Sequence, residues 1–373
     1  MKRSIKKWLG WTVGTVLTLA AVGASAQEYF SIEQVREQAA AGWHGVYQAY
    51  GREITADVEA YISSVERVPV DKMEFARMEP RFPEEETGLL YTIRPEENVF
   101  VFETHDYIEQ VPNKIEKTYE GCVNDPQEWE RAYAPGSSLT LSGTVDIARQ
   151  ALAVMGLEES NWDLAHPYRL ATFAFRHPKT KEIVAPGEYM IDFHQMANGI
   201  SLLNHAGATY RRKTRGNATI RMDLCTIASD MYAISCPMVK SSGRVADDVP
   251  LCSFSTVVEA AEKEILAGHI RKIYGLKFGY LLYEDPEASS ASAQTTHFYA
   301  VPVWQLDCLY LNNPRAELPE YGQDETGDEQ NSLEYANLVI NAQTGEAQDF
   351  MSEKEDRALY QGFLSWEDVQ AAP

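Results

Sequence analysis

A short amphipathic helix followed by several alternating strands recurs in this chain, and this order is the feature that most constrains the fold. It occurs in residues 139–250 and again in residues 251–373. A helix with period 3.6 and strands with period 2 bury their apolar faces together when the helix crosses an antiparallel sheet. The sequence therefore predicts an α+β fold of tandem modules, each an antiparallel sheet with one helix packed across a face.

Three stretches have the apolar spacing of an amphipathic helix: 32–39, 145–155 and 257–266. Ser31 and Gln34 have the spacing of a capping box, in which each side chain bonds the other residue's backbone. Thr256 and Glu259 repeat that spacing before the last stretch. Gly156 follows the middle stretch, where glycine favours the end of a helix. We therefore expect helices at all three places.

Alternating apolar and polar residues predict the strands. The alternation is strict over residues 54–62, which is typical of a half-buried antiparallel strand. Asn198-Gly199 and Thr344-Gly345 supply the positive φ angles that tight hairpin turns need. Further strands are expected at 99–104, 168–177, 188–195, 200–203, 217–225, 230–238, 269–283, 297–310 and 333–342.

The N-terminal residues predict export. Residues 1–26 combine a basic start, an uncharged apolar run and the small residues Ala24-Ser25-Ala26, as a cleaved signal peptide does. An uncleaved anchor is the alternative, because the apolar run approaches the ~20 residues that span a bilayer. We expect an extracytoplasmic protein, secreted or associated with the cell envelope. The predicted regions after the signal are a strand-rich region, a module, and a module with an acidic loop, at 27–138, 139–250 and 251–373.

Charge narrows the range of partners. The chain has 33 Lys and Arg against 55 Asp and Glu, a net charge of −22, and loss of the four basic residues of the signal would make it −26. Such a surface repels nucleic-acid phosphates and anionic lipid headgroups. We therefore expect no nucleic-acid partner. No other run is long and apolar enough to predict a transmembrane segment after signal cleavage.

The five cysteines are an odd number, so at least one thiol has no intramolecular disulfide. Their spacing matches no zinc motif. Cys225 and Cys236 could form a disulfide across a hairpin if their Cα atoms lie within reach. They could equally be buried as small hydrophobic residues.

Several short strings resemble one exported module. Residues 189–195 with the following Asn-Gly-Ile turn resemble the PepSY-like, thermolysin-propeptide-like module, whose strand carries an aromatic residue and a Gln before such a turn. Residues 299–304 and 338–345 are similar to the last strands of that module. The residues that carry this structural motif are Tyr189, Gln195, Asn198, Gly199, Trp304, Asn341 and Gly345.

The resemblance extends to tandem-repeat exported proteins of Gram-positive, clostridial-type bacteria, largely uncharacterised lipoproteins. Regulators of the YycH and YycI type, which act on a cell-wall sensor kinase, have a similar layout. The resemblance implies a non-catalytic regulatory or inhibitory role in the cell envelope, and it transfers no catalytic residue and no cofactor. The chain departs from the pattern because it lacks a lipobox cysteine and because Ser201 stands where the module usually has proline.

Two groups of polar residues could form sites. Asp192 and His194 lie two apart on a predicted strand and so share a face, where they could hold a metal or a proton together with His177. The alternative is a solvated strand face. Residues 324–329 of the acidic loop could bind calcium or could simply be solvated. The chain has no G-x-S-x-G, H-E-x-x-H or glycine-rich phosphate loop.

The sequence favours a non-catalytic accessory protein of the cell envelope that binds and modulates another protein, a protease or a sensor kinase. Sheet edges are natural docking sites, because their unpaired backbone groups accept an added strand. The alternative is a secreted hydrolase or carbohydrate-binding protein, since the two carboxylates of a glycosidase need only converge in space. A purely structural envelope protein is a third possibility.

Overall fold

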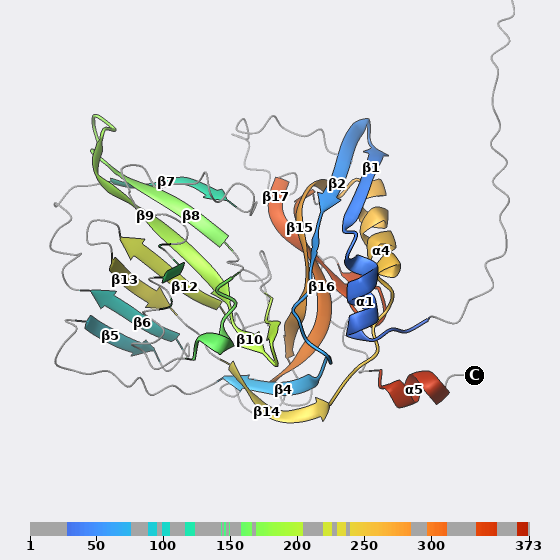
Figure 1. The fold of residues 1–373 in the computed structure, drawn as a ribbon. Coiled ribbons are helices and arrows are strands. Elements are labelled where there is room, and N and C mark those ends of the chain that lie inside the picture. Colours follow the sequence, from blue (N-terminus) through green and yellow to red (C-terminus); the bar gives the residue numbers. More distant parts are fainter. Residues whose placement is uncertain are drawn as a thin grey trace, which may run out of the picture.

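A computed structural model of the chain shows a mixed α+β protein built mostly from antiparallel strands (Figure 1). It describes residues 28–75, 89–94, 99–104, 116–123, 158–165, 169–203, 219–225, 230–235, 239–284, 297–311, 333–348 and 364–371, with single positions between 143 and 149. The signal, Gly156 and the acidic loop lie outside the described residues. Of the predicted helix at 145–155, only positions 145, 146 and 149 are described, and they are helical.

The first of two large sheets, here called the helix-covered sheet, is centred on two long strands that pair along almost their whole length. Its order is β14-β4-β16-β15-β3. β4 and β17 share one edge of β16: β4 pairs with residues 297–299 and β17 with residues 303–311. The strands are β3 (Ala60–Tyr61), β4 (Val70–Phe75), β14 (Val239–Ala246), β15 (Ile270–Glu284), β16 (His297–Leu311), β17 (Leu333–Asn341) and β18 (Ala347–Gln348).

The second sheet is an antiparallel array with the order β5-β6-β13-β12-β9-β8-β7. In Figure 1 it stands beside the helix-covered sheet, on the side away from the helices. Its strands are β5 (Leu89–Arg94), β6 (Val99–Thr104), β7 (Glu116–Val123), β8 (Arg169–Arg176), β9 (Ile183–His194), β12 (Thr219–Cys225) and β13 (Asp230–Ser235).

Two short hairpins complete the strands. The first pairs β1 (Trp43–Ala49) with β2 (Arg52–Val58), and the second pairs β10 (Met196–Ala197) with β11 (Ile200–Ser201). Both turn through two residues with positive φ angles, Tyr50 and Gly51 in the first and Asn198 and Gly199 in the second. Such angles match the twist of the flanking strands. The predicted Asn-Gly turn is therefore confirmed.

Two helices lie side by side on one face of the helix-covered sheet, α1 (Ile32–Ala39) and α4 (Phe254–Leu266) (Figure 1). The predicted capping box of α1 is confirmed, because the Ser31 and Gln34 side chains each bond the other's backbone. The predicted cap of α4 is wrong. Ser253 is the N-cap, and its hydroxyl accepts from the backbone N–H of Thr256. Two further elements have described bounds, a 3-10 turn at Glu159–Asn161 and the short α5 (Trp366–Ala371).

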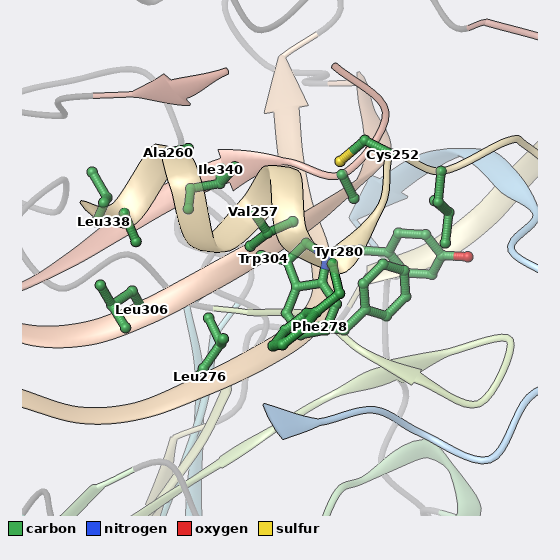
Figure 2. Close-up of a cluster of buried hydrophobic side chains, with 14 of the residues drawn as sticks. Cys252, Val257, Ala260, Leu276, Phe278, Tyr280, Trp304, Leu306, Leu338 and Ile340 are labelled. Atoms are coloured by element: carbon green, nitrogen blue, oxygen red, sulfur yellow. The ribbon is translucent and has the colours of Figure 1, made fainter. Parts of the chain in front are cut away.

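The main core lies between these helices and the sheet. Trp304 of β16 is fully buried at its centre, with ring centroids 5.3 Å from Phe254 and 5.5 Å from Phe278 (Figure 2). Alternate residues of β15 and β16 face the helices, as a two-residue period requires. The opposite face carries a second, smaller cluster: Leu203, Leu281, Tyr283, Tyr299, Val301, Val303 and Val339. The central sheet is therefore buried on both faces.

The sheets do not follow the predicted boundaries at residues 138 and 250. The helix-covered sheet takes β3 and β4 from the predicted strand-rich region and β14 from the predicted middle module. The second sheet combines β5, β6 and β7 with strands of the middle module. Each sheet therefore combines strands from regions that the sequence pattern treats as separate.

Candidate functional site

The β10–β11 turn is fastened to the helix-covered sheet by the side chain of Asn198. Its Nδ2 donates to Asp71 Oδ2 at 3.1 Å, and Arg244 Nη2 donates to its Oδ1 at 3.1 Å. Asp71 lies on β4 and Arg244 on β14, so one amide joins three elements that are distant in sequence. The Asn of the sequence motif is therefore a junction residue as well as a turn residue.

Asp71 and Arg244 form the ionic centre of this junction. The Asp71 side chain is only 4% exposed, whereas that of Arg244 is 42% exposed. Arg244 Nε donates to Asp71 Oδ1 at 2.5 Å, and its Nη1 lies 3.3 Å from Asp247 Oδ1. A buried carboxylate needs such a partner, because an unpaired buried charge is strongly destabilising. Arg244 thus fixes the C-terminal part of β14 to β4, while the rest of its side chain is exposed to solvent.

Gln195 binds the start of β14 as a backbone strand would. Its Nε2 donates to the carbonyl oxygen of Val239 at 2.6 Å, and the Val239 N–H donates to its Oε1 at 3.0 Å. In a strand the N–H and C=O of one residue point to the same side, and those of the next residue point to the other. The N–H and C=O of Val239 both point to Gln195, on the side of β14 away from β4. The N–H and C=O of Ser241, two residues later, therefore point to that same outer side.

β14 is an edge strand that is exposed on both faces. Among the strands that the structure describes it pairs with β4 alone, and every residue from Lys240 to Val245 is exposed. The pairing is irregular after Ser241 and again after Arg244, as expected of β-bulges. Such bulges limit regular pairing along the outer edge to a few residues, so any added strand there is short.

An open depression of about 370 Å³ lies at the C-terminal end of β14. Val65, Glu66, Arg67, Pro69, Asn198, Arg244 and Asp247 line it. Two cations and two anions among these residues balance, whereas the whole chain has a net charge of −22. The candidate site, called the β14 edge below, consists of residues 239–246 and this depression.

His194 is not on a solvated strand face, and that prediction is wrong. Its side chain is fully buried beside the tight bond from Ser201 Oγ to Asp163 Oδ2, which measures 2.7 Å. His177 lies in the turn at the other end of the β8–β9 hairpin, where its Nδ1 accepts from the backbone of Lys179 and Thr180. His177 therefore cannot join His194, which is more than about 20 Å away at 3.3 Å per residue.

Burial lowers the pKa of His194 to about 3, and the nearby charge of Lys277 acts in the same direction. The imidazole is therefore neutral in the folded protein at neutral pH. Asp163 and Ser201 are also buried, and the Asp163 N–H donates to the His194 carbonyl oxygen at 2.9 Å, so the cluster joins the β10–β11 hairpin to the end of β9 and to the segment after the 3-10 turn. Burial gives this cluster a structural role.

This pKa shift predicts a pH effect on stability. The unfolded chain takes up a proton at His194 below about pH 6.5, but the folded chain does not until about pH 3. The free energy of unfolding should therefore decrease as the pH is lowered through that window, by about 1.4 kcal/mol per pH unit from this residue alone. Urea unfolding at pH 7, 6, 5 and 4 should show a steeper loss in the wild type than in His194→Gln. Equal slopes would mean that His194 titrates normally.

The remaining motif residues have structural positions. Asn341 Oδ1 accepts from the backbone N–H of Gln343 and of Thr344, and Gly345 has a φ of 72° in the turn before β18. Trp304 lies in the core. Tyr189 and Asp192 lie in β9, but their side chains are outside the described residues.

Two of the five cysteines, Cys252 and Cys308, are buried and are not in a disulfide. The β12–β13 register pairs Cys225 with Asp230 next to the turn, and Ser235 with Arg221 at the far end of the hairpin. The predicted Cys225–Cys236 disulfide stays a prediction, as does the alternative of two buried thiols. Cys236 itself lies outside the described residues.

The turn glycines give a matched test of the junction. Gly199→Val should lower the free energy of unfolding by about 1 to 3 kcal/mol, because a β-branched residue is strained at a φ of 77°. A Cβ there would also lie 3.2 Å from Val65 Cγ1. Gly51→Val is the control, since Gly51 has a φ of 72° but no atom within 4 Å of an added Cβ. Thermal unfolding should show the larger loss at Gly199, and a larger loss at Gly51 would contradict the docking of the turn.

Two kinds of feature are absent from the part of the chain that the structure describes. No helix there has the length and apolar character to cross a membrane. No three His, Cys, Asp or Glu side chains in the same residues converge as metal ligands would.

Comparisons with known proteins identify no family. No protein-family model matches the sequence, and no curated protein matches it. Among solved structures, the chain is similar to an uncharacterized protein from Eubacterium rectale ATCC 33656, with a TM-score of 0.48 and 11% identity. That likeness covers 79% of this chain and 90% of the other. It carries no conclusion about function.

Proposed function

We propose that this protein is an exported accessory protein that binds an extended segment of another cell-envelope protein along the β14 edge. The observation that carries this proposal is the exposure of β14 on both faces and along its outer side, from Lys240 to Val245. Strand addition uses main-chain hydrogen bonds for affinity and side-chain pockets for specificity. β14 offers the main-chain hydrogen-bonding groups, and the neighbouring depression offers a pocket for side chains.

The contact of Gln195 with Val239 supports this mode of binding. A side-chain amide has the same donor and acceptor as a backbone peptide group, and here it occupies the outer side of β14 with bonds of 2.6 and 3.0 Å. The outer side of this strand therefore accepts strand-like partners within the protein itself. Ser241 is the next residue that points outward.

Local charge also favours docking at this edge. The chain as a whole is strongly acidic, which would repel another acidic protein. The charged residues around the depression balance, so a partner can approach here without that penalty. A protease or a sensor kinase of the envelope is the proposed class of partner, and this part of the proposal rests on the resemblance to PepSY-like and YycH-type proteins.

Ser241→Pro tests the proposal. Proline lacks the N–H that an added strand would accept, and edge strands tolerate it where that N–H faces solvent. Ser241→Ala is the matched control, because it keeps the N–H. A partner cross-linked to the wild type in intact cells should be retained by the alanine variant and lost by the proline variant.

The fold of both Ser241 variants should first be verified by circular dichroism and thermal unfolding. A folded proline variant that retains the partner, and that complements a deletion strain as well as the alanine variant does, would contradict binding along β14.

A further inference from the structure

Arg271 occupies an unusual position at the start of β15, away from the β14 edge. The register with β16 shifts between Ile270 and Lys272, so Arg271 is the extra residue of a β-bulge. A bulge changes the direction in which a side chain points, and bulges are common beside functional sites. The side chain of Arg271 is half-buried.

Two nitrogen atoms of this guanidinium, Nε and Nη1, are buried and have no hydrogen-bond partner among the described residues. Buried polar groups almost always have one, because leaving a charged donor unsatisfied costs more than a neutral one. Trp304 Nε1 is also buried without an acceptor, but it is a neutral donor inside the core. Arg271 combines missing acceptors with a charge.

A second cation stands beside the first. The positive charge of Arg52, on β2, adds to burial in lowering the pKa of Arg271. Like charges repel, so an anion bound beside both arginines would be stabilised by each of them. Arg52 is exposed, and Tyr50 of the adjoining turn also lies within electrostatic reach of Arg271. Such a pair is unexpected in a chain with a net charge of −22.

We propose that Arg271 and Arg52, with the hydroxyl of Tyr50 nearby, bind an oxyanion group, a phosphate or a carboxylate. A guanidinium presents its N–H donors in a fork that matches two oxygens of such a group. One oxyanion would accept from Nη2 together with either Nε or Nη1. It would therefore supply one of the two missing acceptors, and its charge would offset the repulsion between the arginines. Tyr50 is 55% exposed, and an added Cβ at Gly51 would meet no atom within 4 Å. The turn that borders Arg271 is therefore exposed to solvent.

The test uses inorganic phosphate as the first probe and acetate as the second. Each is titrated against sodium chloride of equal ionic strength while the melting temperature of the full chain is measured. The wild type should show a saturable rise with at least one of the two anions. Arg271→Met should abolish the rise, Arg271→Lys should reduce it, and Arg52→Gln should raise the apparent dissociation constant at least tenfold. Lys179→Gln, an exposed lysine in the β8–β9 turn, should respond as the wild type does.

The pattern of the two probes identifies the source of the oxyanion. A response to phosphate alone points to a phosphorylated ligand, and a response to acetate points to a carboxylate. An equal response in the wild type and Arg271→Met, or no saturable response to either anion, would overturn the proposal. Without added oxyanion, Arg271→Met should melt at the same temperature as the wild type or higher. A lower melting temperature would show that the guanidinium already has a structural partner, and would also overturn it.

Discussion

Replacement of Trp304 by alanine should lower the free energy of unfolding by about 3 to 5 kcal/mol, the range for large aromatic residues in a core. The indole is fully buried between Phe254 of α4 and Phe278 of β15, so its loss opens a cavity where helix and sheet meet. Urea unfolding followed by circular dichroism measures the change. Leu266→Ala is the control, because Leu266 is 58% exposed at the end of α4 and should change stability by less than ~0.5 kcal/mol.

A loss at Trp304 no larger than the loss at Leu266 would contradict the packing of α4 on the sheet. In the core of Figure 2 this ring contacts residues of both layers, Phe254 of the helix and Phe278 of the sheet.

Gly279→Val should destabilise the protein by about 3 kcal/mol, the upper end of the usual cost of overpacking. A Cβ at this position of β15 would lie 2.5 Å from Leu203 Cγ and 2.7 Å from the carbonyl oxygen of Ser201. A backbone oxygen cannot turn away as a side chain can, so the residues after the β10–β11 hairpin would be pushed off β15. The bond from the Leu203 N–H to the Tyr280 carbonyl, now 2.7 Å, would break.

Gly243→Val is the control for this variant, because a Cβ added at Gly243 has no atom within 4 Å. Thermal unfolding of the two variants should differ by several degrees. Equal melting temperatures would mean that the hairpin does not lie against β15 as described.

Local patterns in the sequence predict the local structure well. The capping box at Ser31 and Gln34 is present because both side chains act on backbone groups three residues away. The strand at 99–104 has the predicted limits, and the Asn198-Gly199 turn has the predicted positive φ angles. Each of these features depends on residues within one turn or one strand, where spacing and residue type decide the conformation.

Long-range pairing could not be predicted in the same way. β4 and β14 pair across more than 160 residues, and neither strand has a clean two-residue apolar period. The prediction of the N-cap of α4 was wrong for a local reason. Ser253 and Thr256 are both favourable N-cap residues, and the helix begins after the earlier one. Alternation shows that two residues share a face but not whether the face is covered, so the burial of His194 could not be predicted.

The sequence predicts only part of the candidate site. Gln195 and Asn198 belong to the recognised motif, but their partners Val239, Asp71 and Arg244 carry no pattern that connects them. The Arg52–Arg271 pair gave no signal either, because two isolated arginines in an acidic chain are usually solvated. A bulge in β15 and the approach of β2 bring them together.

Hydrogen exchange of β14 tests the central proposal most directly. In the free protein the outward backbone N–H of Ser241 should exchange rapidly, while the ladder between β15 and β16 should remain protected. After the cross-linked partner is identified and mixed with the protein, peptides covering residues 239–246 should gain protection. The Ser241→Pro protein should gain none. Protection that appears elsewhere on the molecule, with residues 239–246 unchanged, would contradict partner binding along the β14 edge.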